Sequence, residues 1–325
     1  MKIPTQGTRT LAFWGLSHAL ADATTGFLLF SLGAVLHVPL AELALLFLLY
    51  NGVGFGFQPL MGLMIDRLQR PHLGAALGVG ILAAVNLLWP LLPSHALWGW
   101  VLIAALASAL FHVSAGGLCL RGPQPLLSAG CFAAPGVLGL SLGIWAALQS
   151  WSVAFPLGLA LCFSSLSFFW QSETQKQAIL PLAEPVKLSE KQELWLLGLL
   201  FAIALRSFFW NRTQLQSPGD WLLWLGMSAC LGKLAGGCLA QRWGLPRVVW
   251  PSSVMALLCL ILPSPPLWLT CLGVAALQSS SPLTLSAVGQ ILPGRPALAA
   301  GLALGLALAL GGVPLLIQLP GLGLP

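Results

Sequence analysis

The stretch GLMIDRLQRP, residues 62–71, decides the fold because it gathers charge between two long apolar runs. It holds Asp66, Arg67 and Arg70, and Asp66 is one of only eight acidic residues among the 325 of the chain. Charged side chains are expensive inside a bilayer, so such a segment is typical of a loop that joins two membrane spans. The stretch therefore predicts a joint at the membrane edge, and neither a catalytic site nor a ligand site.

Composition extends this prediction to the whole chain. Hydrophobic residues make up 58% of the sequence, charged residues only 7%, and the mean hydropathy is +0.90. A soluble domain has about a quarter charged residues, so this supply cannot cover a soluble surface. A transmembrane barrel would need segments of about ten residues that alternate apolar and polar, and no such alternation occurs. The sequence predicts an all-α, polytopic helical membrane protein, with the lipid bilayer as its solvent.

Each helical span needs about 20 apolar residues, and the sequence contains eleven such runs. They lie at residues 11–36, 43–64, 73–92, 97–119, 125–148, 151–170, 194–211, 221–240, 246–263, 266–290 and 297–319. The first run could be read as a cleaved signal peptide, but its apolar stretch continues to Leu36, which favours an uncleaved span.

The 14 lysines and arginines are distributed very unevenly among the loops. All but three fall at the N-terminus or in even-numbered loops; only Arg212 falls in an odd-numbered loop, while Arg206 and Lys233 lie within spans. Cytoplasmic loops carry the excess of positive charge. We therefore expect a cytoplasmic N-terminus and, after eleven spans, a C-terminus outside. The net charge of +6 then reflects orientation and implies no nucleic-acid partner.

The longest loop divides the chain into two parts that share a short repeat. We expect an N-terminal six-helix bundle at residues 1–172, a cytoplasmic linker at 173–193 and a C-terminal five-helix bundle at 194–325. The pattern of the first joint returns 175 residues later, with Gln241 in the place of the acid. The residues expected to form a conformational latch at these two joints are Gly62, Asp66, Arg67, Arg70, Gly237, Gln241 and Arg242.

The first joint resembles the loop between spans 2 and 3 of the major facilitator superfamily. A glycine, three residues, Asp-Arg and a further arginine match the pattern of that family, while Gln69 stands where a glycine is usual. The stretches SHALADATTG (17–26) and ALFHVSAGG (109–117) look like bacterial members related to fosmidomycin-resistance-type efflux proteins. The resemblance implies two pseudo-repeated helical bundles in a bacterial cytoplasmic (inner) membrane. It also implies export of a small organic molecule, coupled to proton entry.

One departure from the family concerns the number of spans. The family normally has twelve, whereas eleven are predicted here. Three explanations stay open: the last span is lost, the protein does something other than full transport, or a partner subunit covers span 11 and completes the bundle.

Polar side chains inside the predicted spans are functional candidates, because an ionisable group at membrane depth is costly to keep. His18 and Asp22 are four residues apart and share one helix face, so we expect them to carry protons. Spans 1, 4, 7 and 10 are equivalent under the repeat, and each has a polar position near its middle. The residues expected to line a substrate cavity are His112, Arg206, Gln278, Asn51 and Gln58.

Structural explanations stand beside these functional ones. Asp22 could be an interhelical tether paired to Arg206 or to a histidine, and His112 could be a satisfied core histidine. Arg206 could clamp an anionic substrate or act as the counterion of Asp22. Lys233 is expected to have a structural role near the second joint.

No phosphate-binding loop, metal-ligand cluster or Ser/His/Asp set stands out, so we expect no enzyme activity, no cofactor and no metal site. The sequence as a whole predicts a secondary active transporter that works by alternating access. The alternative is a non-transporting membrane assembly factor or complex subunit built on the same scaffold.

Overall fold

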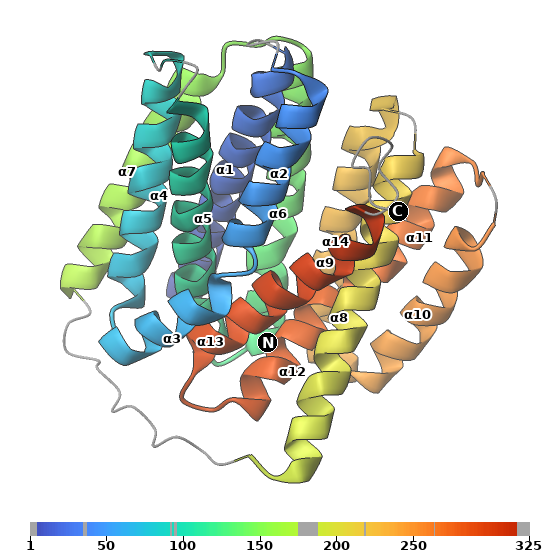
Figure 1. Cartoon of the computed structure of the whole chain (residues 1–325). Helices are drawn as coiled ribbons and strands as arrows, with labels where there is room; N and C mark the ends of the chain where they lie inside the picture. Colours follow the sequence, from blue (N-terminus) through green and yellow to red (C-terminus); the bar gives the residue numbers. More distant parts are fainter. Residues whose placement is uncertain are drawn as a thin grey trace.

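The structure is a computed structural model that describes residues 5–34, 38–91, 93, 96–174, 188–217, 219–262 and 264–316. Its regular secondary structure, within these ranges, is helical (Figure 1). The first half contains α1 (Thr5–Ala34), α2 (Leu40–Gly54), α3 (Gln58–Leu68), α4 (Pro71–Leu88), η1 (Trp89–Leu91), α5 (Leu97–Leu120), α6 (Pro125–Leu148) and α7 (Ala154–Thr174). The second half contains α8 (Glu190–Gln216), η3 (Gly219–Trp221), α9 (Leu222–Trp243), α10 (Pro246–Leu260), α11 (Leu267–Ser279), α12 (Ser281–Ile291), α13 (Pro296–Ala300), η4 (Gly301–Leu306) and α14 (Ala307–Leu316).

The prediction of an all-α polytopic membrane protein is confirmed. Nine helical segments of the described chain are long and apolar enough to cross a membrane. They correspond to nine of the predicted spans, and the other two predicted spans coincide with α1, of 30 residues, and α10, of 15 residues. Most of the predicted linker at 173–193 and both chain ends lie outside the described residues, so their predicted positions relative to the membrane stay predictions.

Two of the predicted spans are broken rather than continuous, and a third contains a π-helical segment. Span 2 stops at Gly54 and restarts at Gln58, whose side-chain amide donates to the Gly54 carbonyl at 2.8 Å. Such a bond satisfies a carbonyl that the break would leave without a partner. Span 10 changes from α11 to α12 just before Pro282, which has no N–H to continue the helical ladder. The apolar pattern alone does not register these interruptions.

The π-helical segment η4 of span 11 lies against the break of span 2. A side chain added at Gly301 or Gly305 would collide with Gln58, so the two irregular segments approach with no room between them. π-Helical turns are rare and occur frequently at functional sites. Each half thus contributes one irregular segment to the same contact.

The start of four helices supports the internal repeat. α4, α6, α10 and α13 all begin with proline, at Pro71, Pro125, Pro246 and Pro296. Proline suits this position because the first helical N–H has no partner within the helix. Pro71 and Pro246 are 175 residues apart, the same offset that separates the two joints.

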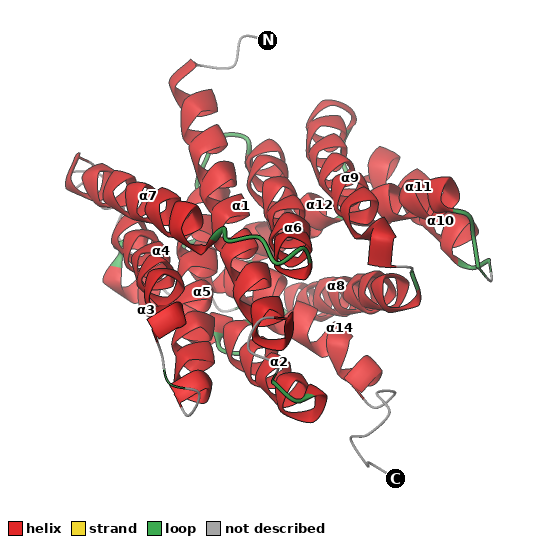
Figure 2. Ribbon diagram, turned by 90° about the horizontal axis from the view of Figure 1, so that it is seen from above, coloured by secondary structure: helices red, strands yellow, loops and turns green. Residues whose placement is uncertain are grey.

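The halves meet in two regions: α6 contacts α9 and α12, and α3 and α5 contact α13 and η4. α6 packs along α9, and α3 packs on α13 and η4 at the lower end of the molecule (Figure 1). Seen from above, α7 lies on α4 at the outer side of the first half, whereas α8 lies beside α14 and α10 beside α11 in the second (Figure 2). Gly130 of α6 faces Gly237 of α9, so the two backbones approach closely.

Candidate functional site

Close packing of α1 on α6 sets the position of the first candidate residues. A Cβ at Gly139 or Gly143 of α6 would collide with the backbone of Ala19 or Ala23 of α1. These glycines bring the helices to backbone contact, which small residues permit in membrane proteins. Gly136 lies under the ring of His18, where any Cβ would meet the imidazole. These three glycines of α6 therefore position the His18 side chain.

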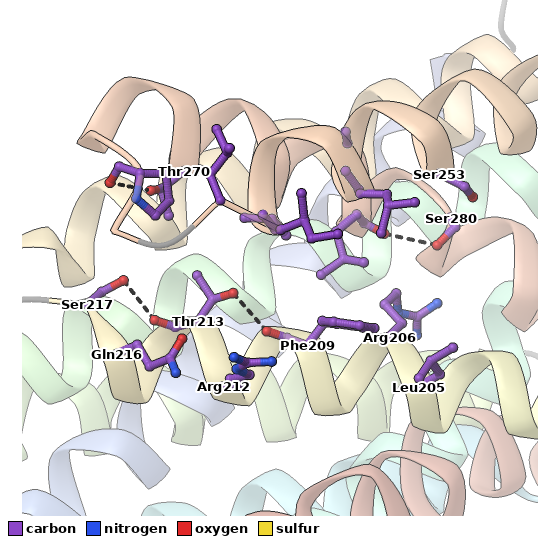
Figure 3. Close-up of a pocket in the computed structure, with 18 of the residues that line it drawn as sticks. Leu205, Arg206, Phe209, Arg212, Thr213, Gln216, Ser217, Ser253, Thr270 and Ser280 are labelled. Carbon is purple, nitrogen blue, oxygen red and sulfur yellow. Dashed lines mark hydrogen bonds between the residues drawn. The ribbon is translucent and has the colours of Figure 1, made fainter.

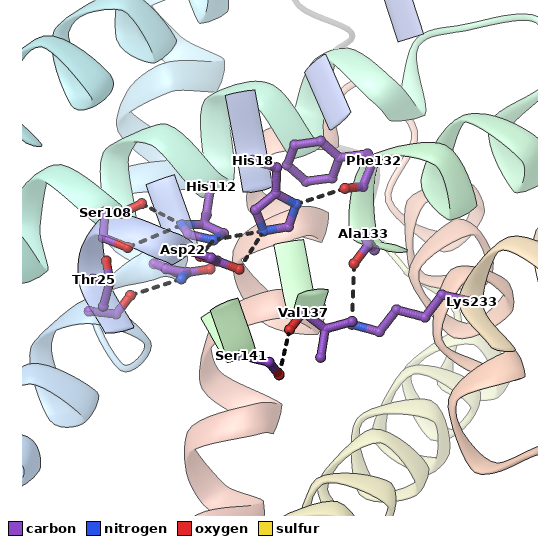
Figure 4. Close-up of polar contacts among 12 residues, drawn as sticks. His18, Asp22, Thr25, Ser108, His112, Phe132, Ala133, Val137, Ser141 and Lys233 are labelled. Atoms are coloured by element: carbon purple, nitrogen blue, oxygen red, sulfur yellow. Dashed lines mark hydrogen bonds and ion pairs between the residues drawn. The ribbon is translucent and has the colours of Figure 1, made fainter. Parts of the chain in front are cut away.

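The His–Asp cluster consists of His18 and Asp22 on α1 and His112 on α5 (Figure 4). The Nε2 atom of His18 lies 3.1 Å from Asp22 Oδ2, and the Nε2 atom of His112 lies 3.1 Å from Asp22 Oδ1. The two Nε2 atoms are 3.0 Å apart. The structure thus brings three residues that were expected to act in transport into direct contact.

Backbone carbonyls fix the tautomer of both histidines. His18 Nδ1 donates to the Phe132 carbonyl at 2.8 Å, and His112 Nδ1 donates to the Ser108 carbonyl at 2.7 Å. A carbonyl oxygen only accepts, so in both neutral rings the proton is on Nδ1 and the lone pair is on Nε2. Two nitrogen lone pairs and a carboxylate then face one another with no hydrogen between them. This arrangement requires a cation in their midst, either a proton or a metal ion.

The surroundings of the cluster are mostly apolar. The His18 ring stacks on Phe132 with centroids 4.3 Å apart, and Phe111 packs at the edge of both imidazoles. Both histidines are buried, whereas the Asp22 side chain is 20% exposed. The cluster is therefore shielded by aromatic rings and accessible from the side of the carboxylate.

A metal ion fits this donor set. One ligand atom each from His18, Asp22 and His112 lies within 4.8 Å of the others. The sequence predicted no metal site, because His112 is far along the chain from the other two and forms no recognised ligand spacing with them. The prediction of no metal site is untested, but the packing of α5 on α1 brings the three residues into a compact set of possible ligands.

Lys233 is the residue near the cluster whose place the sequence did not foresee. Its ammonium group donates to the Ala133 carbonyl at 3.3 Å, one residue after the carbonyl that binds His18 (Figure 4). The lysine comes from α9, so the second half reaches toward a cluster that belongs to the first. A single basic residue beside paired glycines could have indicated a helix contact, but the contacting helix could not be read from the sequence.

Arg206 is separated from the cluster and faces a groove instead. Its guanidinium donates to Thr284 at 3.0 Å, so the ion pair with Asp22 considered from the sequence is replaced by the two histidines. The groove has a volume of about 1320 Å³ and runs between α8 and α10, with α11 and α12 as its floor (Figure 3). Arg206 and Arg212 are the charged residues of its lining, which contains no Asp or Glu.

The position of this groove follows from the repeat. In the first half α7 packs on α4 and α1. The equivalents of those two helices are α10 and α8, and the groove lies between them where α7 has no equivalent among the described helices.

The remaining cavity candidates are not brought to the cluster by any hydrogen bond of the described residues. Asn51 is exposed and its amide donates to Phe47 of its own helix at 2.8 Å. Gln58 closes the break of span 2, and Gln278 is buried on α11 without belonging to the lining of the groove.

The first joint ties the two halves together. The Asp66 side chain is 2% exposed, and its two oxygens accept from the backbone N–H groups of Ala297 at 3.0 Å and Leu298 at 2.8 Å. These groups belong to the first turn of α13, where N–H groups have no partner within the helix. The Asp66 carboxylate of the first half therefore binds the N-terminus of a helix in the second half.

The arginines of the joint are arranged differently from the expectation. Arg67 and Arg70 are exposed, and the positive charges that act on Asp66 belong to Arg121 and Arg295. Burial lowers the pKa of Arg121, and the Asp66 carboxylate opposes this shift. At the second joint Gln241 and Arg242 are both exposed.

Comparison with known structures identifies the arrangement of the helices. The chain is similar to a bacterial homologue of the iron transporter ferroportin in an outward-facing state, with a TM-score of 0.68, 18% identity, and coverage of 96% of this chain and 91% of that one. The fold is that of the major facilitator superfamily. The E. coli fucose:proton symporter FucP, of that superfamily, is similar with a TM-score of 0.63, 12% identity and coverage of 93% and 88%.

No protein-family model matches the sequence, and no curated protein matches it either. The similar structures are described as transporters, and at 12–18% identity the likeness shows the fold alone, so the expectation of no enzyme activity stays a prediction.

Proposed function

We propose that this protein is a secondary active transporter of a small solute, which it moves by alternating access in exchange for protons. The observation that carries the proposal is the His–Asp cluster on a transporter fold: three acceptor groups converge and need a cation between them. A proton is the simplest such cation, since His18, Asp22 and His112 can share one and release it through the exposed side of Asp22. The fucose:proton symporter is an example of this fold with proton coupling.

The direction and the setting follow from the sequence resemblance. Export of a small organic molecule from a bacterial cytoplasm is the mode of the efflux proteins that SHALADATTG and ALFHVSAGG resemble. The distribution of lysine and arginine supports a cytoplasmic N-terminus in the inner membrane. In this orientation the first joint lies on the cytoplasmic side, and the bond from Asp66 to α13 holds that side shut.

Proton-driven flux tests the proposal. The purified protein is placed in lipid vesicles that contain a pH-sensitive dye, a pH gradient is imposed, and a panel of small organic compounds is screened for compound-dependent proton movement. We expect Asp22→Asn to abolish that movement, because the amide cannot hold the proton. His72→Gln, which changes a buried histidine outside the cluster, is the matched control and should retain it. Full gradient-driven flux in Asp22→Asn would show that the cluster is not the proton carrier.

A second candidate function is that of a subunit or assembly factor, and the groove between α8 and α10 favours it. Its lining has two arginines and no carboxylate, so a membrane helix with an acidic residue at the depth of Arg206 would satisfy both the apolar walls and the charge. A photo-crosslinking residue in place of Leu257 in the groove would then capture a stoichiometric partner from membranes. The same residue in place of the exposed Leu166 of α7 serves as the control.

A further inference from the structure

We propose that the His–Asp cluster binds a divalent first-row transition-metal cation, and that this cation is the transported solute. The inference rests on the proposed transport function, and it replaces the organic molecule implied by the resemblance with a metal ion. It is carried by the donor atoms and their positions (Figure 4).

The donor set has the composition of a metal site. Two imidazole nitrogens and one carboxylate are the ligands of the 2-His-1-carboxylate sites that hold divalent iron and leave other coordination positions open. The set contains no thiolate, which favours divalent cations over Cu(I). Its ligands come from two helices, α1 and α5, that contact each other directly.

The orientation of the imidazoles is already the one that ligation needs. A metal-bound histidine usually donates its second N–H to a carbonyl or carboxylate, which fixes the ring and leaves the other nitrogen free to bind. His18 does so toward Phe132 and His112 toward Ser108. Neither Nε2 atom therefore has to rotate or lose a ring proton to become a ligand.

The spacing of the three groups fits the coordination sphere of such a cation. Neighbouring ligands at about 2.1 Å from an octahedral metal lie about 3.0 Å from one another. The observed separations are 3.0 Å between the two Nε2 atoms and 3.1 Å from each to the nearer carboxylate oxygen. His18 faces Oδ2 of Asp22 and His112 faces Oδ1, so a metal ion bound between the two nitrogens would be held from its third side by this carboxylate.

The site is suited to exchange rather than to permanent binding. The partly exposed carboxylate of Asp22 leaves one side open to water, so the remaining coordination positions can be filled and emptied. Lys233, which donates to the Ala133 carbonyl, places a positive charge near the cluster, and its repulsion lowers the affinity of the cluster for a metal cation. A carrier must release its solute, and both features limit the affinity.

Metal binding by the purified full-length chain is the first test. Metal-free protein in detergent is titrated with Co²⁺ and with Mn²⁺, and the Co²⁺-loaded protein is examined by X-ray absorption. We expect one ion per chain and two imidazoles in its coordination shell, with one imidazole left in His18→Gln or His112→Gln. Each of these variants and Asp22→Asn should bind at least about 10-fold more weakly, whereas His72→Gln should bind like the wild type.

Two results would overturn the metal site. One is the absence of stoichiometric binding by the wild-type chain, which does not depend on the folding of any variant. The other is binding that all three cluster variants retain unchanged, since that places the ion elsewhere, for example on a cysteine.

Flux in vesicles distinguishes this inference from the proposed function. We expect wild-type vesicles loaded with a metal-sensitive dye to take up Co²⁺, and Asp22→Asn vesicles to lose that uptake. If an organic compound drives proton movement while Co²⁺ is neither bound nor moved, the metal site is ruled out and the proposed transport function is retained. If Co²⁺ binds at the cluster but no solute crosses, the transport function fails, and with it the role of the metal as cargo.

Discussion

The two joints of the repeat share their glycines but differ in what the following polar residue does. At the first joint Gly62 lets α3 contact the backbone of Ala297, and Asp66 binds two N–H groups of α13. At the second joint Gly237 lets α9 approach Leu126 and Gly130 of α6, but Gln241 is exposed and has no side-chain hydrogen bond among the described residues. The helices thus pack closely at both joints, but only at the first joint does a carboxylate form hydrogen bonds between the halves.

This difference indicates which of the two contacts between the halves can open. The α6–α9 contact continues along both helices, with Gly226 against Ser141 far from the joint. The α3–α13 contact lies next to the broken parts of spans 2 and 11 and depends on one carboxylate. We therefore expect the two halves to separate at the first joint, while the α6–α9 contact acts as the hinge.

The largest expected effect breaks the packing of the first joint. A Cβ at Gly62 would lie 2.4 Å from the Ala297 carbonyl oxygen and 2.8 Å from the Leu298 Cα, and neither backbone atom can turn away. Gly62→Ala should therefore separate α3 from α13, at a cost of about 3 kcal/mol in the closed form. Spin labels on the two helices would report the change as a longer distance.

Gly237→Ala is the matched change at the second joint. Its Cβ would meet the Leu126 carbonyl oxygen at 2.8 Å and the Gly130 Cα at 3.2 Å, so we expect a smaller cost of about 1 kcal/mol. If Gly62→Ala and Gly237→Ala destabilised the closed form equally, the idea that the joints differ would be contradicted.

The second prediction concerns Asp66→Asn, which removes the negative charge of the side chain at the first joint and keeps its size. Asp66→Asn retains one acceptor oxygen but loses the charge, and hydrogen bonds to charged groups contribute about 1.5–3 kcal/mol each. A loss of about 2 kcal/mol corresponds to roughly 30-fold in the ratio of closed to open forms. The same spin-label distances measure this ratio, and Gln241→Asn is the control that should leave it unchanged. An unaltered ratio in Asp66→Asn would rule out the latch.

Several features of this comparison could be predicted from the sequence, and others could not. The apolar runs, the joint at residues 62–71 and the equivalence of Asp66 with Gln241 depend on local composition and on spacing, which the sequence displays directly. The approach of His112 to Asp22 depends instead on glycines of α6 that draw α1 inward, which is a matter of packing between helices. The breaks in spans 2 and 10 also escaped the hydropathy pattern, because glycine, serine and proline hardly interrupt it.

Arg206 is a residue whose burial could be predicted from the sequence, while its contacts could not. Its place on span 7 was read correctly as a buried polar position, but the equivalence of spans 1, 4, 7 and 10 suggested that it faces His18 and Asp22. The side chain points to the groove between α8 and α10, where it binds Thr284. The direction of a side chain around its helix depends on neighbours that a span count does not locate.

The third prediction gives the second joint the acid that it lacks. Gln241→Asp places a carboxylate near the first turn of α6, where negative charge is favourable by about 0.3–1 kcal/mol. We expect a small rise in the thermal unfolding midpoint, and partial recovery of the closed form when the change is combined with Asp66→Asn. Gln241→Asn, which adds no charge, should do neither. If the combined variant is as open as Asp66→Asn alone, the second joint does not share the chemistry of the first.

The smallest expected effect concerns the turn that follows Asp66. Gln69 has a φ of 53°, a left-handed conformation that glycine adopts without strain, and glycine is usual at this position in the resembled family. Gln69→Gly relieves about 1 kcal/mol of backbone strain, but it removes the hydrogen bond from the Gln69 amide to the Asp66 carbonyl. We therefore expect a gain of at most about 0.5 kcal/mol, measured as the unfolding midpoint in detergent. Gln69→Ala loses the same hydrogen bond without relief of strain, so it should be less stable than both the wild type and Gln69→Gly. If Ala and Gly behave alike there, the turn is held by its hydrogen bond and the backbone conformation contributes nothing to the joint.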